Sequence, residues 1–124
     1  MRFLFTLLAT SSFTLAAEAP AKLAPDKAAP LISEKKVQLL DVRTEEEWNE
    51  GRIEGATRVE IGTEDFAAKV KAGFDPSEPV LVYCRSGRRS ARASDQLQAM
   101  GFETVYDLKG GILAWSADGQ KVVK

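Results

Sequence analysis

One short segment constrains the fold of this 124-residue chain more than any other. Residues 79–83 read Pro-Val-Leu-Val-Tyr, an unbroken apolar run of strand length. A strand with one solvated face alternates apolar and polar side chains, whereas a continuous apolar run is typical of a strand buried on both faces. Such strands belong to parallel sheets that carry helices on either side. The segment therefore predicts the centre of an α/β domain.

The remaining segments alternate between strand and helix patterns, as a parallel sheet covered by helices requires. Three further strands are predicted at residues 37–41, 57–61 and 104–106. Helices are predicted at residues 45–50, at 63–72, from the loop after position 84 to Met100, and after Gly110-Gly111. The first helix is the best defined, because Thr44 and Glu47 have the spacing of a capping box and Gly51 follows as a stop.

The first 17 residues have the pattern of a secretory signal peptide. Arg2 supplies the positive start, an apolar run follows, and the small residues Ala16 and Ala17 precede a polar position. The run is broken by hydroxyl side chains and is shorter than the roughly 20 apolar residues of a membrane span. We expect cleavage after Ala16 or Ala17, a periplasmic location and no stable membrane insertion afterwards. An uncleaved N-terminal anchor is the alternative.

Residues 18–30 contain three prolines and five alanines and offer little apolar surface to bury. This composition predicts an extended tether. The expected organisation is a signal peptide at 1–17, a tether at 18–30 and one domain at 31–124, which is long enough to form its own core.

Two residue counts exclude several classes of function. The chain has one cysteine and no histidine, so an internal disulfide and a Ser-His-Asp triad are both excluded. A zinc site needs several His or Cys ligands, and no metal or other cofactor is expected. The net charge of −1 argues against a nucleic-acid partner. A lone thiol in an exported protein is exposed to oxidation unless it is buried or used.

The residues after strand 79–83 predict a use for that thiol. They read Cys84-Arg-Ser-Gly-Arg-Arg-Ser90 and run into a helix N-terminus, where free backbone N–H groups favour an anion. A glycine lets the loop curl so that several N–H groups converge, and the arginines add positive charge. Because the loop itself can hold a thiolate, no histidine is needed. The candidate site consists of the nucleophile Cys84 and the anion-binding residues Arg85, Ser86, Gly87, Arg88 and Arg89.

Cysteine-dependent phosphatases use a similar loop, in which an arginine follows the cysteine after five intervening residues. Here that place is taken by Ser90, and Tyr83 precedes the cysteine where those enzymes usually carry histidine. The loop is one residue short for a phosphate and suits a smaller group such as a terminal sulfur.

Taken together, four motifs resemble the rhodanese family, specifically its small single-domain sulfurtransferases. The resemblance extends from about Leu31 to Val123. Its motifs are Leu39–Arg43, Glu47-Trp48 with Gly51–Ala56, Cys84–Arg89, and Gly110-Gly111 with Ala114-Trp115. The family pattern usually has histidine where this chain has Arg52 and proline where it has Glu54. Both departures lie outside the active loop, so they bear on local structure more than on activity.

The resemblance implies a fold and a reaction. The fold would be a central parallel sheet of about five strands flanked by helices. Cys84 would take a sulfane sulfur from a small donor such as thiosulfate and pass it, as a persulfide, to cyanide or a thiol. The alternative is a persulfide carrier that delivers sulfur to a partner protein. Asp41 and Arg43 are expected to form a structural ion pair, and Trp48 and Trp115 are expected to be packing residues.

Overall fold

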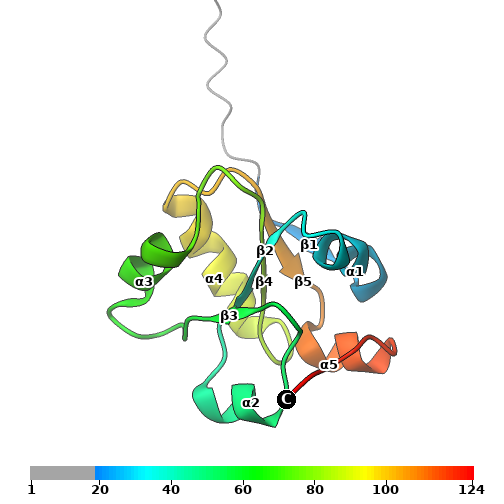
Figure 1. The fold of residues 1–124 in the computed structure, drawn as a ribbon. Coiled ribbons are helices and arrows are strands. Elements are labelled where there is room, and N and C mark those ends of the chain that lie inside the picture. Colours follow the sequence, from blue (N-terminus) through cyan, green and yellow to red (C-terminus); the bar gives the residue numbers. More distant parts are fainter. Residues whose placement is uncertain (1–18) are drawn as a thin grey trace, which may run out of the picture.

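A five-stranded parallel sheet forms the centre of the computed structural model, which describes residues 19–124. In space the strands lie in the order β1-β5-β4-β2-β3, and every neighbouring pair is parallel (Figure 1). Their bounds are β1 Ala21–Leu23, β2 Gln38–Asp41, β3 Thr57–Arg58, β4 Val80–Tyr83 and β5 Val105–Leu108. The predicted fold class is confirmed, with the apolar run at the central position and fully buried. The predicted signal peptide at 1–17 lies outside the described residues and stays a prediction.

Helices cover both faces of the sheet (Figure 1). They are α1 Pro25–Ser33, α2 Glu45–Glu50, α3 Phe66–Gly73, α4 Arg88–Ala99 and α5 Gly111–Ala117. One core cluster joins α3 and α4 to the sheet through side chains such as Val70, Leu97 and Val82. The other joins α1 and α5 through Ala28, Leu81 and Trp115. Because β4 contributes alternate side chains to both clusters, its position is fixed from two sides.

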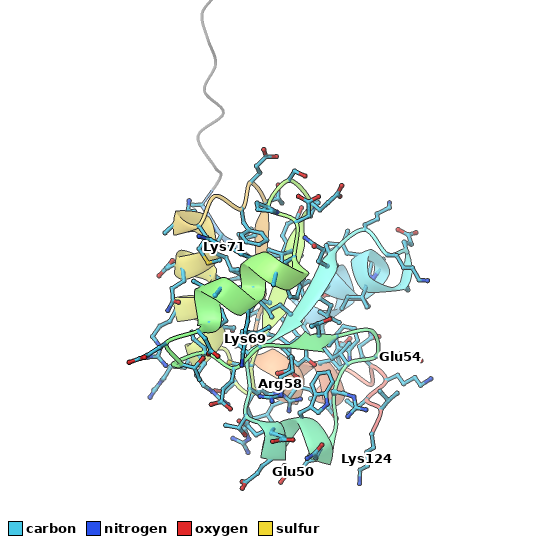
Figure 2. The ribbon with its side chains drawn as sticks, turned by 60° about the vertical axis from the view of Figure 1, so that its left-hand side comes forward. Glu50, Glu54, Arg58, Lys69, Lys71 and Lys124 are labelled. Carbon is cyan, nitrogen blue, oxygen red and sulfur yellow. The ribbon has the colours of Figure 1, made fainter. Side chains whose placement is uncertain are left out.

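The exposed surface of α3 carries two lysines among small residues, because the helix buries only Phe66 and Val70 against the sheet. Lys69 and Lys71 point away from the sheet on this helix (Figure 2). Lys69 pairs with Asp65 one turn earlier at 3.0 Å, an exposed pair that contributes little to stability.

The predicted tether at 18–30 is wrong for most of its length, because these residues form β1 and most of α1. The edge strand β1 pairs with β5 through its backbone, which needs no apolar side chains. Pro25 begins α1, where its missing N–H costs nothing, and Ala28 is completely buried against the sheet. The composition therefore concealed two ordered elements, and the domain begins about ten residues before Leu31.

The other predicted elements differ from the structure mainly at their ends. β3 contains two residues, whereas a strand at 57–61 was predicted. Beyond the regular strand, the backbone N–H groups of Val59 and Ile61 still donate to the carbonyls of Asp41 and Val42. α3 begins at Phe66, since the Thr63 hydroxyl donates to the Glu60 carbonyl and does not cap the helix. The capping box of α2 is present as predicted.

The inclusion of β1 and α1 in the domain leads to a stability prediction. A chain that begins at Leu31 should unfold at lower urea concentration than one that begins at Ala19, because β5 loses its strand partner and the pocket for Ala28 is emptied. We expect the free energy of unfolding to fall by at least about 2 kcal/mol, which is the contribution of one buried aliphatic side chain. Equal midpoints for the two chains in urea denaturation would show that residues 19–30 are a tether after all.

Candidate functional site

The single cysteine lies at the carboxyl end of the central strand. Cys84 follows β4 directly, and its side chain is 1% exposed. Ligands of open parallel sheets bind beyond the carboxyl ends of the strands, which is where this thiol lies. The predicted site residues 85–89 surround it, with Arg85, Ser86 and Arg88 exposed at the surface.

Hydrogen-bond donors converge on the Cys84 sulfur. The backbone N–H of Gly87 donates to Sγ at 3.0 Å, and the thiol contacts the Ser90 hydroxyl at 3.5 Å. Burial by itself would raise the pKa of the thiol. The Ser90 hydroxyl and the backbone N–H groups of Ser90, Gly87 and Ser86 outweigh burial, so the pKa of Cys84 lies below its ordinary value. The loop therefore stabilises the thiolate, which is the nucleophilic form.

A left-handed glycine creates this convergence. Gly87 has φ of 107° and is the N-cap residue of α4, so the chain reverses just before the helix and its N–H groups turn inward. A side chain at this position would strain the backbone and displace the N–H that meets the sulfur.

The first turn of α5 holds the loop from behind. The N–H of Ile112 donates to the Cys84 carbonyl at 2.9 Å, and the N–H of Leu113 donates to the Arg85 carbonyl at 3.1 Å. A Cβ on Gly111 would collide with both of these carbonyl groups, so this approach requires glycine. The loop carbonyls thus point back into α5, and this leaves the N–H groups free to face the sulfur.

Arg89 is engaged elsewhere than its sequence position suggested. It was predicted to bind an anion with Arg85 and Arg88, but its terminal nitrogens donate to the two carboxylate oxygens of Glu47 at 2.7 and 2.8 Å. The hydrogen bond from Arg89 is the main reason that the pKa of Glu47 falls to about 2. Because Glu47 also belongs to the capping box of α2, this ion pair ties the active loop to α2. The predicted capping box had already singled out Glu47, but its long-range partner could not be read from spacing.

The Asp41–Arg43 pair is structural, as expected. The two side chains are buried and meet at 2.7 Å, and Arg43 also donates to the Gly51 carbonyl at 2.7 Å. In the same segment after α2, the N–H of Ile53 donates to the hydroxyl oxygen of the buried Tyr83 at 3.1 Å. These contacts hold the segment after α2 against the central strands.

The two positions that depart from the family pattern fit into this segment. The Arg52 backbone exchanges two hydrogen bonds of 2.8 Å with Val123, and its guanidinium stacks 4.5 Å from the centre of the Trp48 ring. Glu54 is exposed and lies 3.6 Å from Lys121. Neither side chain contacts the active loop. Trp115 is buried, as expected for a packing residue.

Sequence reasoning missed two buried polar residues next to the loop. Ser90 is completely buried, and Asp107 is 2% exposed on β5. Among the described residues, Asp107 Oδ1 has no hydrogen-bond partner. A polar residue in the otherwise apolar strand around Val105 was the available signal for Asp107.

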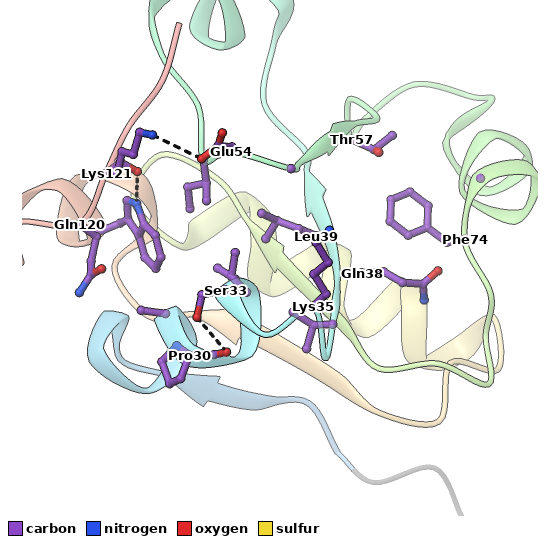
Figure 3. Close-up of a pocket in the computed structure, with 17 residues that line it drawn as sticks. Pro30, Ser33, Lys35, Gln38, Leu39, Glu54, Thr57, Phe74, Gln120 and Lys121 are labelled. Carbon is purple, nitrogen blue, oxygen red and sulfur yellow. Dashed lines mark hydrogen bonds and ion pairs between the residues drawn. The ribbon is translucent and has the colours of Figure 1, made fainter.

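A second cavity, larger than the site around the thiol, lies away from the loop. It has a volume of about 1070 Å³ and is lined by apolar side chains such as Leu39 and Phe74 together with Gln38, Lys35 and Lys121 (Figure 3). None of residues 84–90 lines it. It contains no thiol, so the loop around Cys84 remains the candidate chemical site. No helix among residues 19–124 has the length and apolar character needed to cross a membrane.

Comparisons with known proteins agree with this geometry. Residues 24–118 match the model of the rhodanese-like domain family. The chain is 36% identical over 89 residues to "Thiosulfate sulfurtransferase 18" of Arabidopsis thaliana, covering 63% of this chain and 65% of that protein. It is 39% identical over 88 residues to "tRNA uridine(34) hydroxylase" of Protochlamydia amoebophila, covering 67% of this chain and 28% of that protein. The match thus spans less than two thirds of either relative.

The solved structures include a close match in shape. The Alr3790 protein from Anabaena superposes with a TM-score of 0.74 at 29% identity, over 82% of this chain and 81% of that one.

The Arg89–Glu47 ion pair leads to a prediction about pH and stability. The folded-state pKa of Glu47 is depressed, so the pair stabilises the fold fully above the ordinary carboxyl pKa and loses its effect as pH falls toward about 2. Glu47→Gln should lower the free energy of unfolding by about 1 kcal/mol at pH 6 and by progressively less in acid.

Urea denaturation at several pH values measures this difference. Glu45→Gln is the matched control, because Glu45 is an exposed carboxylate in the same helical turn. A Glu47→Gln effect that is independent of pH, or one that Glu45→Gln reproduces, would contradict the ion-pair account.

Proposed function

The chain belongs to the rhodanese-like domain family, and we propose that it is a sulfurtransferase that carries sulfur as a persulfide on Cys84. The observation that carries this proposal is the set of hydrogen-bond donors around one sulfur atom at the end of the central strand. They lower the pKa of the thiol without any histidine. A stabilised thiolate that is nearly closed off from solvent is suited to attack on a small donor.

The reaction would proceed in two displacements at sulfur. The Cys84 thiolate attacks the outer sulfur of thiosulfate, a new S–S bond forms, and sulfite leaves with the electrons of the broken S–S bond. An acceptor such as cyanide or a thiolate then attacks the outer sulfur of the persulfide and releases the Cys84 thiolate. No external oxidant or reductant is consumed. The same N–H groups that hold the thiolate would hold the persulfide anion.

Two arginines are available to hold the donor. Arg85 and Arg88 are exposed on the loop, whereas Arg89 is bound to Glu47. A sulfonate group at the rim of the loop would meet these guanidinium groups while the outer sulfur enters toward Sγ. The choice of thiosulfate as donor rests on this charge and on the small size of the loop. Location in an exported compartment is proposed from the pattern of residues 1–17 alone.

Intact-mass spectrometry tests the persulfide step directly. After treatment with thiosulfate, the protein should gain the mass of one sulfur atom and lose it again on addition of cyanide or dithiothreitol. Cys84→Ser should show no gain while keeping its fold, because the chain has no other thiol. Rapid cyanide-dependent turnover would identify an enzyme, and a persulfide that passes only to a protein acceptor would identify a carrier.

The phosphatase alternative is tested on the same preparation. We expect thiocyanate formation from thiosulfate and no hydrolysis of p-nitrophenyl phosphate. Efficient cleavage of the phosphate ester with no reaction on thiosulfate would show that the sulfurtransferase proposal is wrong.

A further inference from the structure

The Ser90 hydroxyl has more hydrogen-bond acceptors around it than it has hydrogens to donate. It contacts the Cys84 sulfur at 3.5 Å and donates to the Gly87 carbonyl at 3.2 Å. It also acts on the buried Asp107 carboxyl, where burial raises the pKa and the Ser90 hydroxyl lowers it. A hydroxyl has a single hydrogen to donate. When both the thiol and the carboxyl are ionised, Ser90 can therefore satisfy only one of them.

The sheet brings Asp107 and Cys84 together on the same face. Asp107 of β5 is in register with Val82 of β4, and Cys84 follows Val82 by two residues. Strand spacing and rise then put the two backbone positions roughly 8 Å apart. Val82 and Cys84 belong to the core cluster beneath α4, and Ser90 is buried in the first turn of that helix. The Ser90 hydroxyl comes from the helix that covers this face of the sheet, and it contacts the thiol.

Within residues 19–124, the buried Asp107 carboxyl lacks a hydrogen-bond donor for one of its oxygens. Burial raises its pKa above the ordinary value, against the opposing effect of the Ser90 hydroxyl. Lys22 of β1 also lowers this pKa, and Asp95 of α4 raises it. Oδ1 has no hydrogen-bond partner among the described residues, and the Ser90 hydroxyl is the hydrogen-bonding group that lowers the pKa of this carboxyl. A cavity of about 330 Å³ lies beside it and is also lined by Lys22, Ser86, Gly87, Arg88 and Lys109. Through this cavity Asp107 can exchange protons with solvent.

We propose that Asp107 is a positioning residue that sets the acidity of Cys84 by competing with its thiolate for the Ser90 hydroxyl. The proposal rests on the assignment of Cys84 as the nucleophile. With Asp107 neutral, the hydroxyl donates to the thiolate and the thiol ionises readily. With Asp107 ionised, the hydroxyl turns to the carboxylate and the thiolate loses a donor. The thiol and the carboxyl therefore titrate as a coupled pair.

A double-mutant cycle on the thiol pKa tests the competition. The pKa is measured from the pH dependence of iodoacetamide alkylation, which is specific to Cys84 because the chain has no other cysteine. Asp107→Asn removes the charged competitor, so the pKa should fall and alkylation below the wild-type pKa should accelerate by about three- to tenfold. Ser90→Ala removes the donor, so the pKa should rise. In the Ser90→Ala background, Asp107→Asn should have less than about a third of its single-mutant effect.

A matched control separates competition from simple charge. Glu103→Gln removes an exposed carboxylate two residues before β5 and should leave the thiol pKa unchanged. If Asp107→Asn shifts the thiol pKa equally with and without Ser90, the charge acts through space and the proposal is overturned. It is also overturned if Asp107→Asn leaves the thiol pKa unchanged. Alkylation needs no sulfur donor, so these outcomes are independent of whether a persulfide forms.

If Asp107→Asn does not fold, the coupling can be measured by NMR titration of the native Asp107 side chain. The carboxyl ¹³C signal of Asp107 should show a second inflection at the pKa of Cys84. That inflection should disappear in Cys84→Ala. A single inflection that Cys84→Ala leaves unaltered would show that the two groups are uncoupled.

Discussion

The path of the loop around the Cys84 sulfur is the constraint on which the candidate site depends. A buried thiolate is costly unless donors replace the water that it loses, and this chain has no histidine to share the charge. The donors are backbone N–H groups and one hydroxyl, so their positions depend entirely on the path of the loop. Two contacts fix that path. The first turn of α5 draws the loop carbonyls backward, and the Arg89–Glu47 pair anchors the start of α4 to α2.

This arrangement divides the loop arginines into two kinds. Arg89 is structural, because its terminal nitrogens are bound to Glu47, whereas Arg85 and Arg88 remain exposed at the mouth of the loop. A similar division holds beneath the loop, where the Asp41–Arg43 pair supports the segment after α2 and the Ser90 hydroxyl contacts the thiol. Charged residues near the candidate reactive group therefore include structural supports. Burial and existing partners distinguish the two roles, and sequence position does not.

The sequence predicted the parts that local patterns control. The apolar run at 79–83, the capping box at Thr44 and Glu47, and the loop after the central strand each depend on neighbouring residues, and the structure contains all three. It did not predict β1, because an edge strand is stabilised by backbone pairing with β5 and its Ala-Lys-Leu sequence has no strand pattern. Nor could it predict the partners of Arg89 and Ser90, since Glu47 and Asp107 come close to them only when the sheet has assembled.

The claim that the loop stabilises the thiolate is tested most directly by the pKa of Cys84 in the unmodified protein. This pKa is measured from the ultraviolet absorbance of the thiolate as pH is varied. Below about pH 9 the change in the thiolate band comes from one residue, since the chain has a single cysteine and free tyrosine ionises only at about 10. The account predicts an inflection clearly below the free-thiol value of about 8.5 in the folded protein, and a return to about 8.5 when urea unfolds the loop. An inflection at or above about 8.5 in the folded protein would contradict the claim that the loop stabilises the thiolate.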